Sequence, residues 1–253
     1  MRCSEEGELM FKLYNNIIAE KLDTEDVKVI EGFYKEEAFN PYTAFLAGGN
    51  LCWKNATKDY INLALVEKMF FNKRGDREWD CSENFEIDGK VVKARYMTKI
   101  WVKRPDTDDS VCKVVSVKNM SRGENAYYNN QEFYITNITS WDEIQLTDTI
   151  TGEDIVIDRE EIYKYFDYAY ATTIHRAQGS TIDAPYSIND WNDRLSKKLK
   201  YVAVSRTSDR GNIQINRRWE HKIPVKKTKN AWELDRNVLL ETFKEGRWFP
   251  KKK

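Results

Sequence analysis

Cysteine and histidine are scarce in this sequence, and neither is arranged as a metal site. The residues are Cys3, Cys52, Cys81, Cys112, His175 and His221. No two cysteines have the Cys-x-x-Cys spacing, and the thiolates of a structural zinc site usually come in close pairs, so no metal site is predicted. Scattered, unpaired thiols are typical of a reducing compartment, and we therefore expect an intracellular location.

The sequence also lacks an excess of either charge and any long apolar run. Lys and Arg together number 41, as do Asp and Glu together, so the formal net charge is zero. A basic coat over the whole surface is therefore excluded, whereas a local basic groove is not. No apolar run reaches the roughly 20 residues of a membrane span, and the N-terminus lacks the basic-then-apolar pattern of a secretory leader, so no membrane partner is expected.

Apolar and aromatic residues, in contrast, are plentiful enough for a core. Apolar residues make up 41% of the 253 residues, which suffices for one large or two small domains and argues against disorder. Eight tryptophans and 14 tyrosines leave two interpretations open. They indicate either a core rich in aromatic rings or rings that stack on nucleic-acid bases.

The first part of the chain predicts α/β structure. Apolar residues recur at helical spacing within residues 7–38, where Gly32 interrupts the pattern. Residues 50–54 are predicted to form a short buried strand, and residues 56–71 a helix with one apolar face. A strand, a short turn and a helix in this order are typical of an α/β sheet.

The middle of the chain changes to β character. Residues 76–90 are acidic and predict an exposed loop or, alternatively, a segment that binds a partner. The strands predicted after it are Val91–Val102, Val111–Val117, Phe133–Ile138, Glu143–Thr147 and Asp154–Ile157. Several short strands separated by turn formers predict a small barrel or sandwich, inserted between two α/β segments.

The α/β pattern returns after Ile162. Strands are predicted at residues 168–174, 201–204 and 213–215, and a helix at residues 191–199. The tail that follows is basic, which predicts either non-specific contacts with phosphates or an ordinary solvated face.

Two polar segments of this C-terminal part carry the candidate chemistry. The first begins at the end of the strand predicted at 168–174 and contains Thr173, His175, Arg176, Gln178 and Gly179. Hydroxyl, imidazole and backbone donors at the carboxyl edge of an α/β sheet suit phosphate oxygens, and a satisfied polar turn is the alternative. In the second segment, Arg206 offers a rigid charged fork to a phosphate or, alternatively, forms a surface ion pair.

Together the two segments resemble motifs V and VI of superfamily 1 helicases, in the RecD-like branch that includes the Dda phage helicase. Motif V of that branch reads Tyr-Ala-x-Thr-Ile/Val-His-Lys-Ser/Ala-Gln-Gly-x-Thr, and residues 170–181 read YATTIHRAQGST. Motif VI reads Tyr-Val-Ala-Leu-Ser-Arg, and residues 201–206 read YVAVSR. Arg176 replaces the usual Lys, which keeps the charge but changes the donor geometry, and Thr207 replaces the usual Ala.

The resemblance extends more weakly over roughly residues 45–216. Leu51–Asn55 and Asp59–Asn62 resemble motif IV, in which a strand and Thr/Lys-Asn precede a helix with Ile-Asn. Tyr128–Glu132 resembles the Asn-Gly-Glu turn of the small SH3-like barrel of this branch, with Asn130 at the usual glycine; asparagine tolerates the left-handed backbone. No G-x-x-x-x-G-K-[ST] phosphate loop occurs in the sequence, and no Walker-B motif is visible.

For the fold, the resemblance implies the second RecA-like helicase domain, an α/β structure with a parallel sheet, flanking helices and an inserted SH3-like β-barrel. Residues 1–40 would form an N-terminal helical segment, residues 41–90 and 160–253 the RecA-like domain, and residues 91–159 the barrel. The phosphate-loop domain would be an N-terminal RecA-like domain of a longer polypeptide.

For the function, the resemblance implies the C-terminal portion of an ATP-dependent 5′–3′ DNA helicase for replication or repair, inactive as this chain alone. Arg206 would be an arginine finger for ATP, whose phosphates and Mg²⁺ are held mainly by the missing domain. Gln178 and Gly179 would lie near the nucleotide. The predicted contacts with single-stranded DNA are Thr173, His175, Arg176 and Asn55, and the rings considered for base stacking are Trp101, Tyr127 and Tyr128. Replication proteins are further expected partners, in the cytoplasm or at a nuclear or viral replication site.

Two other classes of function remain open at this point. One is a helicase-derived scaffold that binds nucleic acid in a replication complex and never hydrolyses ATP, which the missing phosphate loop and the natural-looking Met1 favour. The other is a plain β-barrel interaction domain joined to an α/β partner.

Overall fold

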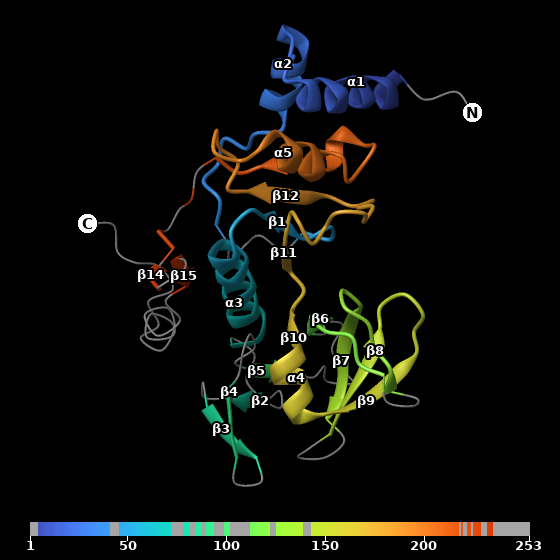
Figure 1. Cartoon of the computed structure of the whole chain (residues 1–253), viewed down its shortest axis with the longest axis vertical. Coiled ribbons are helices and arrows are strands. Elements are labelled where there is room, and N and C mark those ends of the chain that lie inside the picture. Colours follow the sequence, from blue (N-terminus) through green and yellow to red (C-terminus); the bar gives the residue numbers. More distant parts are fainter. Residues whose placement is uncertain are drawn as a thin grey trace. The chain divides into compact units, whose positions relative to one another are not determined.

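In the computed structural model, the chain divides into two compact units, and each is described by itself (Figure 1). The first unit comprises residues 1–65 and 170–253, and the second comprises residues 66–169. The structure describes residues 5–40, 46–71, 78–80, 84–87, 90–93, 99–101, 112–121, 125–138, 143–217, 219, 222–223, 225–228 and 232–234.

A four-stranded parallel sheet forms the centre of the first unit. Its strands, in spatial order, are β11 (Ala171–Thr173), β1 (Asn50–Cys52), β12 (Tyr186–Asn189) and β13 (Ile213–Ile215). β1 pairs in parallel with both β11 and β12, so that Cys52 lies opposite Thr173 on one side and Asn189 on the other. All residues of β1 and β12 are buried, as is usual for parallel strands covered on both faces.

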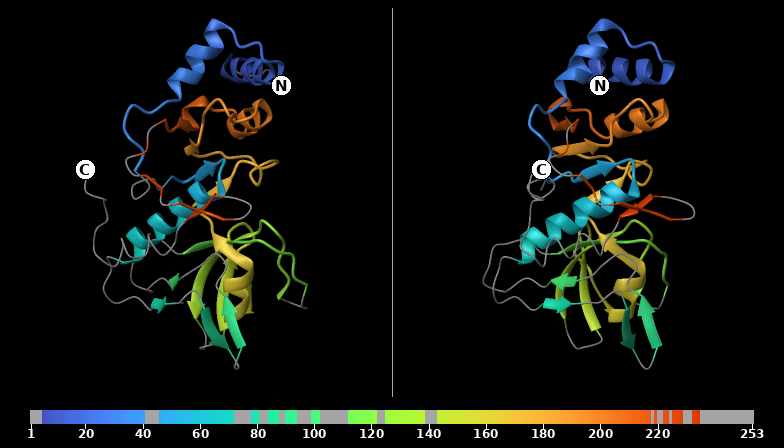
Figure 2. Two further views of the ribbon diagram at one scale, coloured as in Figure 1. Left: turned by 60° about the vertical axis from the view of Figure 1, so that its left-hand side comes forward. Right: turned by 90° about the vertical axis from the view of Figure 1, so that its left-hand side faces the viewer.

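Helices cover both faces of this sheet (Figures 1 and 2). α5 (Lys197–Val204) lies on one face and α1 (Glu5–Ala19) packs on α5, whereas α3 (Asn55–Phe71) starts beneath the opposite face. The apolar core on the α5 side includes Met10, Leu13, Leu51, Ile188, Ala203 and Ile215. Burial of this core is the main stabilising contribution, because each fully buried aliphatic side chain contributes about 1.5–3 kcal/mol.

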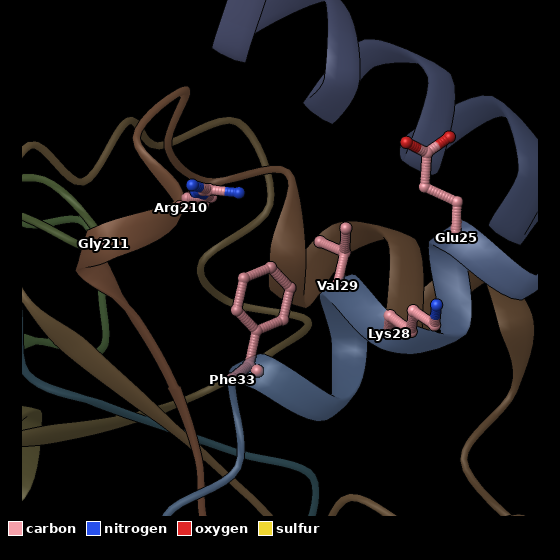
Figure 3. Close-up of a pocket in the computed structure, with 7 residues that line it drawn as sticks. Glu25, Lys28, Val29, Phe33, Arg210 and Gly211 are labelled. Atoms are coloured by element: carbon pink, nitrogen blue, oxygen red, sulfur yellow. The ribbon is translucent and has the colours of Figure 1, made fainter.

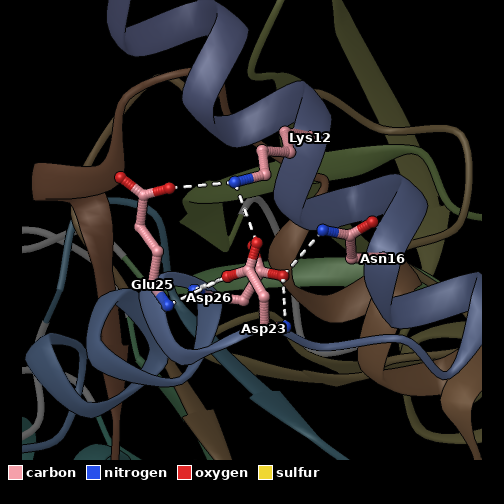
Figure 4. Close-up of polar contacts among 5 residues, drawn as sticks. All are labelled: Lys12, Asn16, Asp23, Glu25 and Asp26. Carbon is pink, nitrogen blue, oxygen red and sulfur yellow. Dashed lines mark hydrogen bonds and ion pairs between the residues drawn. The ribbon is translucent and has the colours of Figure 1, made fainter.

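Exposed polar contacts join α1 to α2 (Thr24–Gly32), as Figure 4 shows. Lys12 Nζ lies 2.9 Å from Asp23 Oδ2 and 2.9 Å from Glu25 Oε2, and hydrogen bonds to these two carboxylates raise the pKa of Lys12. Asn16 Nδ2 donates to Asp26 Oδ2 at 2.7 Å, and Asp23 and Asp26 form a capping box at the start of α2. Exposed ion pairs contribute little, so these contacts serve mainly to orient α2 on α1.

Buried polar side chains form a series of hydrogen bonds across the sheet. Ser187 Oγ donates to Asn50 Oδ1 at 2.6 Å, Asn189 Nδ2 donates to Ser187 Oγ at 3.0 Å, and Asn216 Nδ2 donates to Asn189 Oδ1 at 3.1 Å. Asn50 Nδ2 extends the series to the carbonyl oxygen of Tyr170 at 3.0 Å. We call Asn50, Ser187, Asn189 and Asn216 the amide ladder. Because its members bind one another, they are buried without leaving polar groups unpaired.

The second unit is built on a five-stranded antiparallel sheet. Its strands, in spatial order, are β10 (Phe166–Tyr168), β6 (Lys113–Ser116), β7 (Glu132–Ile138), β8 (Glu143–Asp148) and β9 (Asp154–Asp158), with α4 (Arg159–Tyr165) between β9 and β10 in sequence. Two smaller pairs join β2 (Glu78–Asp80) to β5 (Lys99–Trp101) and β3 (Asn84–Ile87) to β4 (Lys90–Lys93). In the turn before β7, Asn130 has φ +73°, the left-handed backbone that the sequence predicted for it.

The structure confirms many of the predicted elements. Helices α1 and α2 occupy the periodic region 7–38, β1 and α3 form the predicted strand and helix, and β13 coincides with the strand at 213–215. Strands β6 to β9 lie within the predicted β region. Further elements were not predicted, among them the short pair β14 (Val225–Lys227) and β15 (Trp232–Leu234).

The predicted strand at residues 201–204 is wrong, because these residues form the last turn of α5. A short apolar run suits a buried helix as well as a buried strand. Ser196 decides between them, since its side chain accepts a hydrogen bond from the backbone N–H of Leu199 and starts the helix there. The predicted helix at residues 191–199 accordingly begins only at Lys197.

Three other predicted boundaries also differ from the structure. The strand predicted at 168–174 is divided between β10 and β11, which belong to different sheets. The acidic segment 76–90, predicted as a loop or a partner-binding segment, contains β2 and β3. The described residues of the strand predicted at 91–102 belong to β4 and β5, which pair with different strands. In each case pairing with a distant partner sets the strand limits, and a local pattern does not contain that information.

Candidate nucleic-acid interface

The ends of β1, β11 and β12 form one edge of the parallel sheet, which we call the carboxyl edge. The backbone N–H of Ile174 donates to the carbonyl oxygen of Cys52 at 2.9 Å, so the pairing of β11 with β1 continues to the point where both strands end. Burial strongly raises the pKa of the Cys52 thiol, which therefore stays protonated at neutral pH. Ligands bind at this edge in open α/β sheets, so the residues just beyond it are the candidates for an interface.

The turn after β11 brings several predicted site residues to the carboxyl edge. Thr173 Oγ1 accepts a hydrogen bond from the backbone N–H of Arg176 at 3.3 Å, which closes the first part of the turn. His175 and Gln178 are exposed, and Arg176 is half-buried. Gly179 has φ +92°, a backbone conformation that favours glycine. Thr173, His175 and Arg176 therefore lie next to one another at the position where the sequence predicts contacts with phosphates.

Asp190, directly after β12, anchors the loop between β1 and α3. Its Oδ2 accepts from the backbone N–H of Lys54 at 3.0 Å, and its Oδ1 accepts from the Thr57 hydroxyl at 2.9 Å. The first N–H groups of a helix have no partner within the helix, so a carboxylate at this point is stabilising. It fixes the position of Asn55, the exposed first residue of α3 and a predicted DNA contact.

The sequence analysis did not identify Asp190. The residue has φ +63°, which apart from glycine is adopted mainly by asparagine and aspartate. An aspartate directly after a buried strand is the available signal, but nothing local shows that its partner lies on α3.

Asn62, on the buried face of α3, joins the helix to the start of β11. Its Oδ1 accepts from the backbone N–H groups of Tyr170 at 3.1 Å and Ala171 at 2.7 Å, and its Nδ2 donates to the carbonyl oxygen of Ala171 at 3.1 Å. The segments that resemble motifs IV and V are thus in direct contact. The asparagine of the Ile-Asn pair has a positioning role in this structure.

Arg206 is bonded to the turn after β11 through its guanidinium. Nη1 donates to the carbonyl oxygens of Ala177 at 3.2 Å and Ser180 at 2.9 Å. Nε donates to the carbonyl oxygen of Val202 at 2.8 Å, and Nη2 donates to Ser205 Oγ at 2.9 Å. Arg206 is therefore linked directly to the segment that carries Gln178 and Gly179, the two residues predicted near a nucleotide.

Two tyrosines bind backbone carbonyls at the end of α5, close to Arg206. Tyr186 Oη donates to the carbonyl oxygen of Ala203 at 2.9 Å, and Tyr14 Oη donates to that of Thr207 at 2.5 Å. The last carbonyls of a helix lack partners within the helix, and Tyr186 supplies one for Ala203, whereas the partner of Tyr14 lies just beyond the helix. Burial raises the pKa of Tyr14 to about 12 and raises that of Tyr186 as well.

The rings considered for stacking differ in their surroundings. Tyr127 is fully buried and its Oη lies 3.3 Å from Glu161 Oε2, so its face is closed to a base. Tyr128 is 65% exposed. The side chain of Trp101 lies outside the described residues. The sequence analysis did not consider Trp53 and Trp191 for stacking; these half-buried rings lie one residue after β1 and two residues after β12, at the carboxyl edge.

A separate pocket of about 440 Å³ lies between α2 and the turn at Arg210–Asn212, as Figure 3 shows. Its lining residues are Glu25, Lys28, Val29, Gly32, Phe33, Arg210 and Gly211. No predicted site residue lines it. Across the described part of the chain, no group of three or more acidic, histidine or cysteine side chains is arranged to hold a metal ion. Among the helices that the structure describes, none has the length and apolar character needed to cross a membrane.

Comparison with known proteins identifies the fold. No protein-family model matches the chain, and no curated protein matches it in sequence. Among solved structures, the chain resembles a Pif1 helicase structure on DNA unwinding at forked dsDNA by two coordinating Pif1 helicases, with 18% identity, a TM-score of 0.58 and 100% of this chain covered. It also resembles Bacteroides Pif1 in complex with ADP-AlF3 and ssDNA (14%, 0.56, 97% covered) and Pif1 from Candida albicans (11%, 0.54, 95% covered).

These matches cover 55%, 55% and 58% of the respective solved chains, so this chain spans little more than half of their length. At such low identity they show the fold alone. The chain has the α/β fold of the corresponding part of Pif1 helicases, which is consistent with a RecA-like helicase domain.

Proposed function

We propose that this chain is the second RecA-like domain, with an inserted SH3-like barrel, of an ATP-dependent 5′–3′ DNA helicase of the RecD-like and Dda-like branch. In this proposal it binds single-stranded DNA and supplies Arg206 as an arginine finger. ATP and Mg²⁺ are held mainly by an N-terminal RecA-like domain of the same polypeptide. The enzyme acts inside the cell in DNA replication or repair, with replication proteins as further partners, and this chain alone hydrolyses no ATP.

The observation that carries the proposal is the direct bonding of Arg206 to the turn after β11. The carbonyls of Ala177 and Ser180 accept from its guanidinium, and the same turn begins with Thr173 and His175 at the carboxyl edge. A nucleotide phosphate that binds Arg206 competes with these carbonyls. Nucleotide binding therefore acts directly on the segment proposed to contact DNA, as a motor that couples hydrolysis to movement along a strand requires.

The residues present fit the phosphate chemistry that the proposal assigns to them. A guanidinium is permanently charged and binds phosphate oxygens in a bidentate manner, and the exposed turn at Gln178 and Gly179 adds the side-chain amide of Gln178. Hydroxyl, imidazole and guanidinium groups at Thr173, His175 and Arg176, with the Asn55 amide, suit the phosphates of a strand. The similar Pif1 structure with ADP-AlF3 and ssDNA contains both kinds of ligand.

Binding of single-stranded DNA by this chain tests the first half of the proposal. We expect weak binding of a labelled oligo-dT in fluorescence anisotropy, weakened further by His175→Ala and Arg176→Ala. Arg176→Ala should also reduce the slope of log affinity against log salt by about one, since one phosphate contact is lost. Lys21→Ala, an exposed lysine between α1 and α2, is the control and should change neither quantity. If neither His175→Ala nor Arg176→Ala changes the affinity for oligo-dT, the proposed DNA site is contradicted.

ATP hydrolysis by the parent polypeptide tests the second half. Arg206→Ala should lower the DNA-stimulated rate by about 10³- to 10⁵-fold, the usual contribution of an arginine finger, while DNA affinity is retained. Unchanged turnover in this variant refutes the finger assignment.

A second candidate function is a scaffold that binds nucleic acid and never hydrolyses ATP. The hydrogen bonds that Arg206 makes to its own chain favour it, since a guanidinium held by Ala177, Val202, Ser180 and Ser205 already has a structural role. In that case the wild-type parent polypeptide binds nucleic acid and shows no ATP hydrolysis.

A further inference from the structure

Trp53 and Trp191 follow neighbouring strands at the carboxyl edge of the parallel sheet. Trp53 comes directly after β1, and Trp191 is the second residue after β12. Because β1 and β12 pair in parallel and Cys52 lies opposite Asn189, both rings begin from the same edge. Asp190, which precedes Trp191, binds the backbone N–H of Lys54, the residue after Trp53.

Each ring packs on the core with only part of its surface. Both tryptophans contact the apolar cluster on the α5 side of the sheet, yet both stay half-buried rather than buried. Core contact on one side limits the motion of the ring, so little conformational entropy remains to be lost when a ligand stacks on the other side. A fixed and partly exposed indole is the usual element of a base-stacking site.

A lysine lies near each ring. Lys54 Nζ is 5.7 Å from the centroid of the Trp53 ring, and Lys200 Nζ is 5.5 Å from that of Trp191, both within the range of a cation–π interaction. A positive charge therefore lies beside an aromatic ring at two positions along the carboxyl edge. A nucleotide has the complementary chemistry, with a flat base and an anionic phosphate joined by a sugar.

We infer that Trp53 and Trp191 form a base-stacking site for single-stranded nucleic acid, with Lys54 and Lys200 facing the adjoining phosphates. The inference rests on the proposed function, because it assigns bases to the edge at which Thr173, His175 and Arg176 are proposed to take phosphates. It adds an affinity for bases that is independent of sequence, since every base has a face that stacks.

Two labelled probes of about 15 nucleotides, the upper end of the site size of such grooves, separate base contacts from phosphate contacts. One is oligo-dT, and the other is an abasic strand with the same number of phosphates and no bases. Fluorescence anisotropy gives the affinity of each probe for wild type, Trp53→Ala, Trp191→Ala, Trp53→Phe and Trp191→Phe. Trp219→Ala is the matched control, because Trp219 packs at 4.6 Å from Phe39 and at 6.1 Å from Tyr60 (ring centroids).

We expect wild type to bind oligo-dT more tightly than the abasic strand. Each alanine variant should weaken oligo-dT binding by about 5- to 100-fold and leave abasic binding and its salt dependence unchanged. The phenylalanine variants keep a stacking ring and the contact with the core, so they should retain most of the affinity, which excludes misfolding as the cause. Trp219→Ala should bind both probes as wild type does.

Three results would overturn the inference. The first is equal binding of the two probes by wild type, and the second is an alanine variant that loses affinity for both probes alike. The third is an oligo-dT affinity that no tryptophan variant changes. In these cases the phosphate interface stands and only the stacking site fails. If wild type binds neither probe, the proposed DNA-binding function itself fails, and the inference fails with it.

Discussion

Nη1 of Arg206 lies 2.9 Å from the carbonyl oxygen of Ser180, although the two residues are 26 positions apart in the sequence. The same atom donates to the carbonyl oxygen of Ala177, so one guanidinium spans the turn from its middle to its end. Charged donors form the stronger hydrogen bonds in proteins, and this contact therefore holds the turn against the end of α5.

Replacement of Arg206 should loosen this turn. Arg206→Ala should reduce the free energy of unfolding by about 1–3 kcal/mol, because carbonyl groups of the turn lose their charged donor. Amide hydrogen exchange from residue 177 to residue 182 should become faster at the same time. Arg206→Lys should restore only part of the loss, since an ammonium cannot reproduce the planar fork. Arg194→Ala, an exposed arginine, serves as control, and exchange rates equal to those of wild type in Arg206→Ala would contradict the role assigned to the guanidinium.

Substitutions at Asp190 should separate its charge from its backbone conformation. Asp190→Ala removes the acceptor for Lys54 and Thr57 and retains φ +63°, so we expect a loss of about 1–3 kcal/mol in urea unfolding. Asp190→Asn keeps one acceptor oxygen and tolerates the left-handed backbone, and should lose less than half as much. Equal losses of unfolding free energy in the two variants would show that the hydrogen bonds of Asp190 to Lys54 and Thr57 do not stabilise the loop between β1 and α3.

Asn62 forms buried hydrogen bonds between α3 and the start of β11. Asn62→Ala should destabilise the first unit by about 2–4 kcal/mol, since the backbone groups of Tyr170 and Ala171 lose their partners in a buried position. Asn62→Asp keeps the acceptor but loses the donor and buries a charge, so it should not rescue stability. Chemical denaturation followed by circular dichroism measures the stability of both variants. A loss of less than about 0.5 kcal/mol in the free energy of unfolding of Asn62→Ala would contradict the positioning role of Asn62.

Tyr14 should make stability depend on alkaline pH. Burial raises its pKa from 10 to about 12 in the folded protein, so the folded state resists deprotonation more than the unfolded chain does. The contribution is therefore fully present below pH 10 and is lost as pH rises through 12. Tyr14→Phe removes this dependence, and its thermal midpoint should fall less than that of wild type between pH 10 and pH 12. Parallel curves for the two proteins would rule out Tyr14 as a source of the effect, with Tyr186 left as the other buried phenol.

Prediction from sequence succeeds here where local pattern and physical environment agree. The helical periodicity before residue 38 and the strand and helix from residue 50 to 71 both reflect which side of an element is buried. The polar segment was predicted at the carboxyl edge of a strand, and the structure places Thr173 at the end of β11 with His175 in the turn that follows. The structure brings Arg206 to that turn, as the resemblance to motifs V and VI implied.

The failures share a different cause. Residues 201–204 form a helix because Ser196 caps it, and four apolar residues in a row do not distinguish a buried strand from a buried helix turn. Asp190 escaped detection because its function depends on a loop more than 130 positions away. Trp53 was predicted in the strand at 50–54 and Trp191 in the helix at 191–199, but neither was considered for stacking, since only the pairing of β1 with β12 brings them to one edge.

The amide ladder fixes the register of β1 against β12. In the structure Asn50 pairs with Ser187. A shift of β1 by one position would place the Asn50 amide opposite Ile188 and leave buried polar atoms without hydrogen-bond partners. Sliding of one strand past the next is therefore too costly to serve as a motion. We therefore expect the four strands to keep their register when a ligand binds, so that any rearrangement is confined to the loops beyond the strand ends.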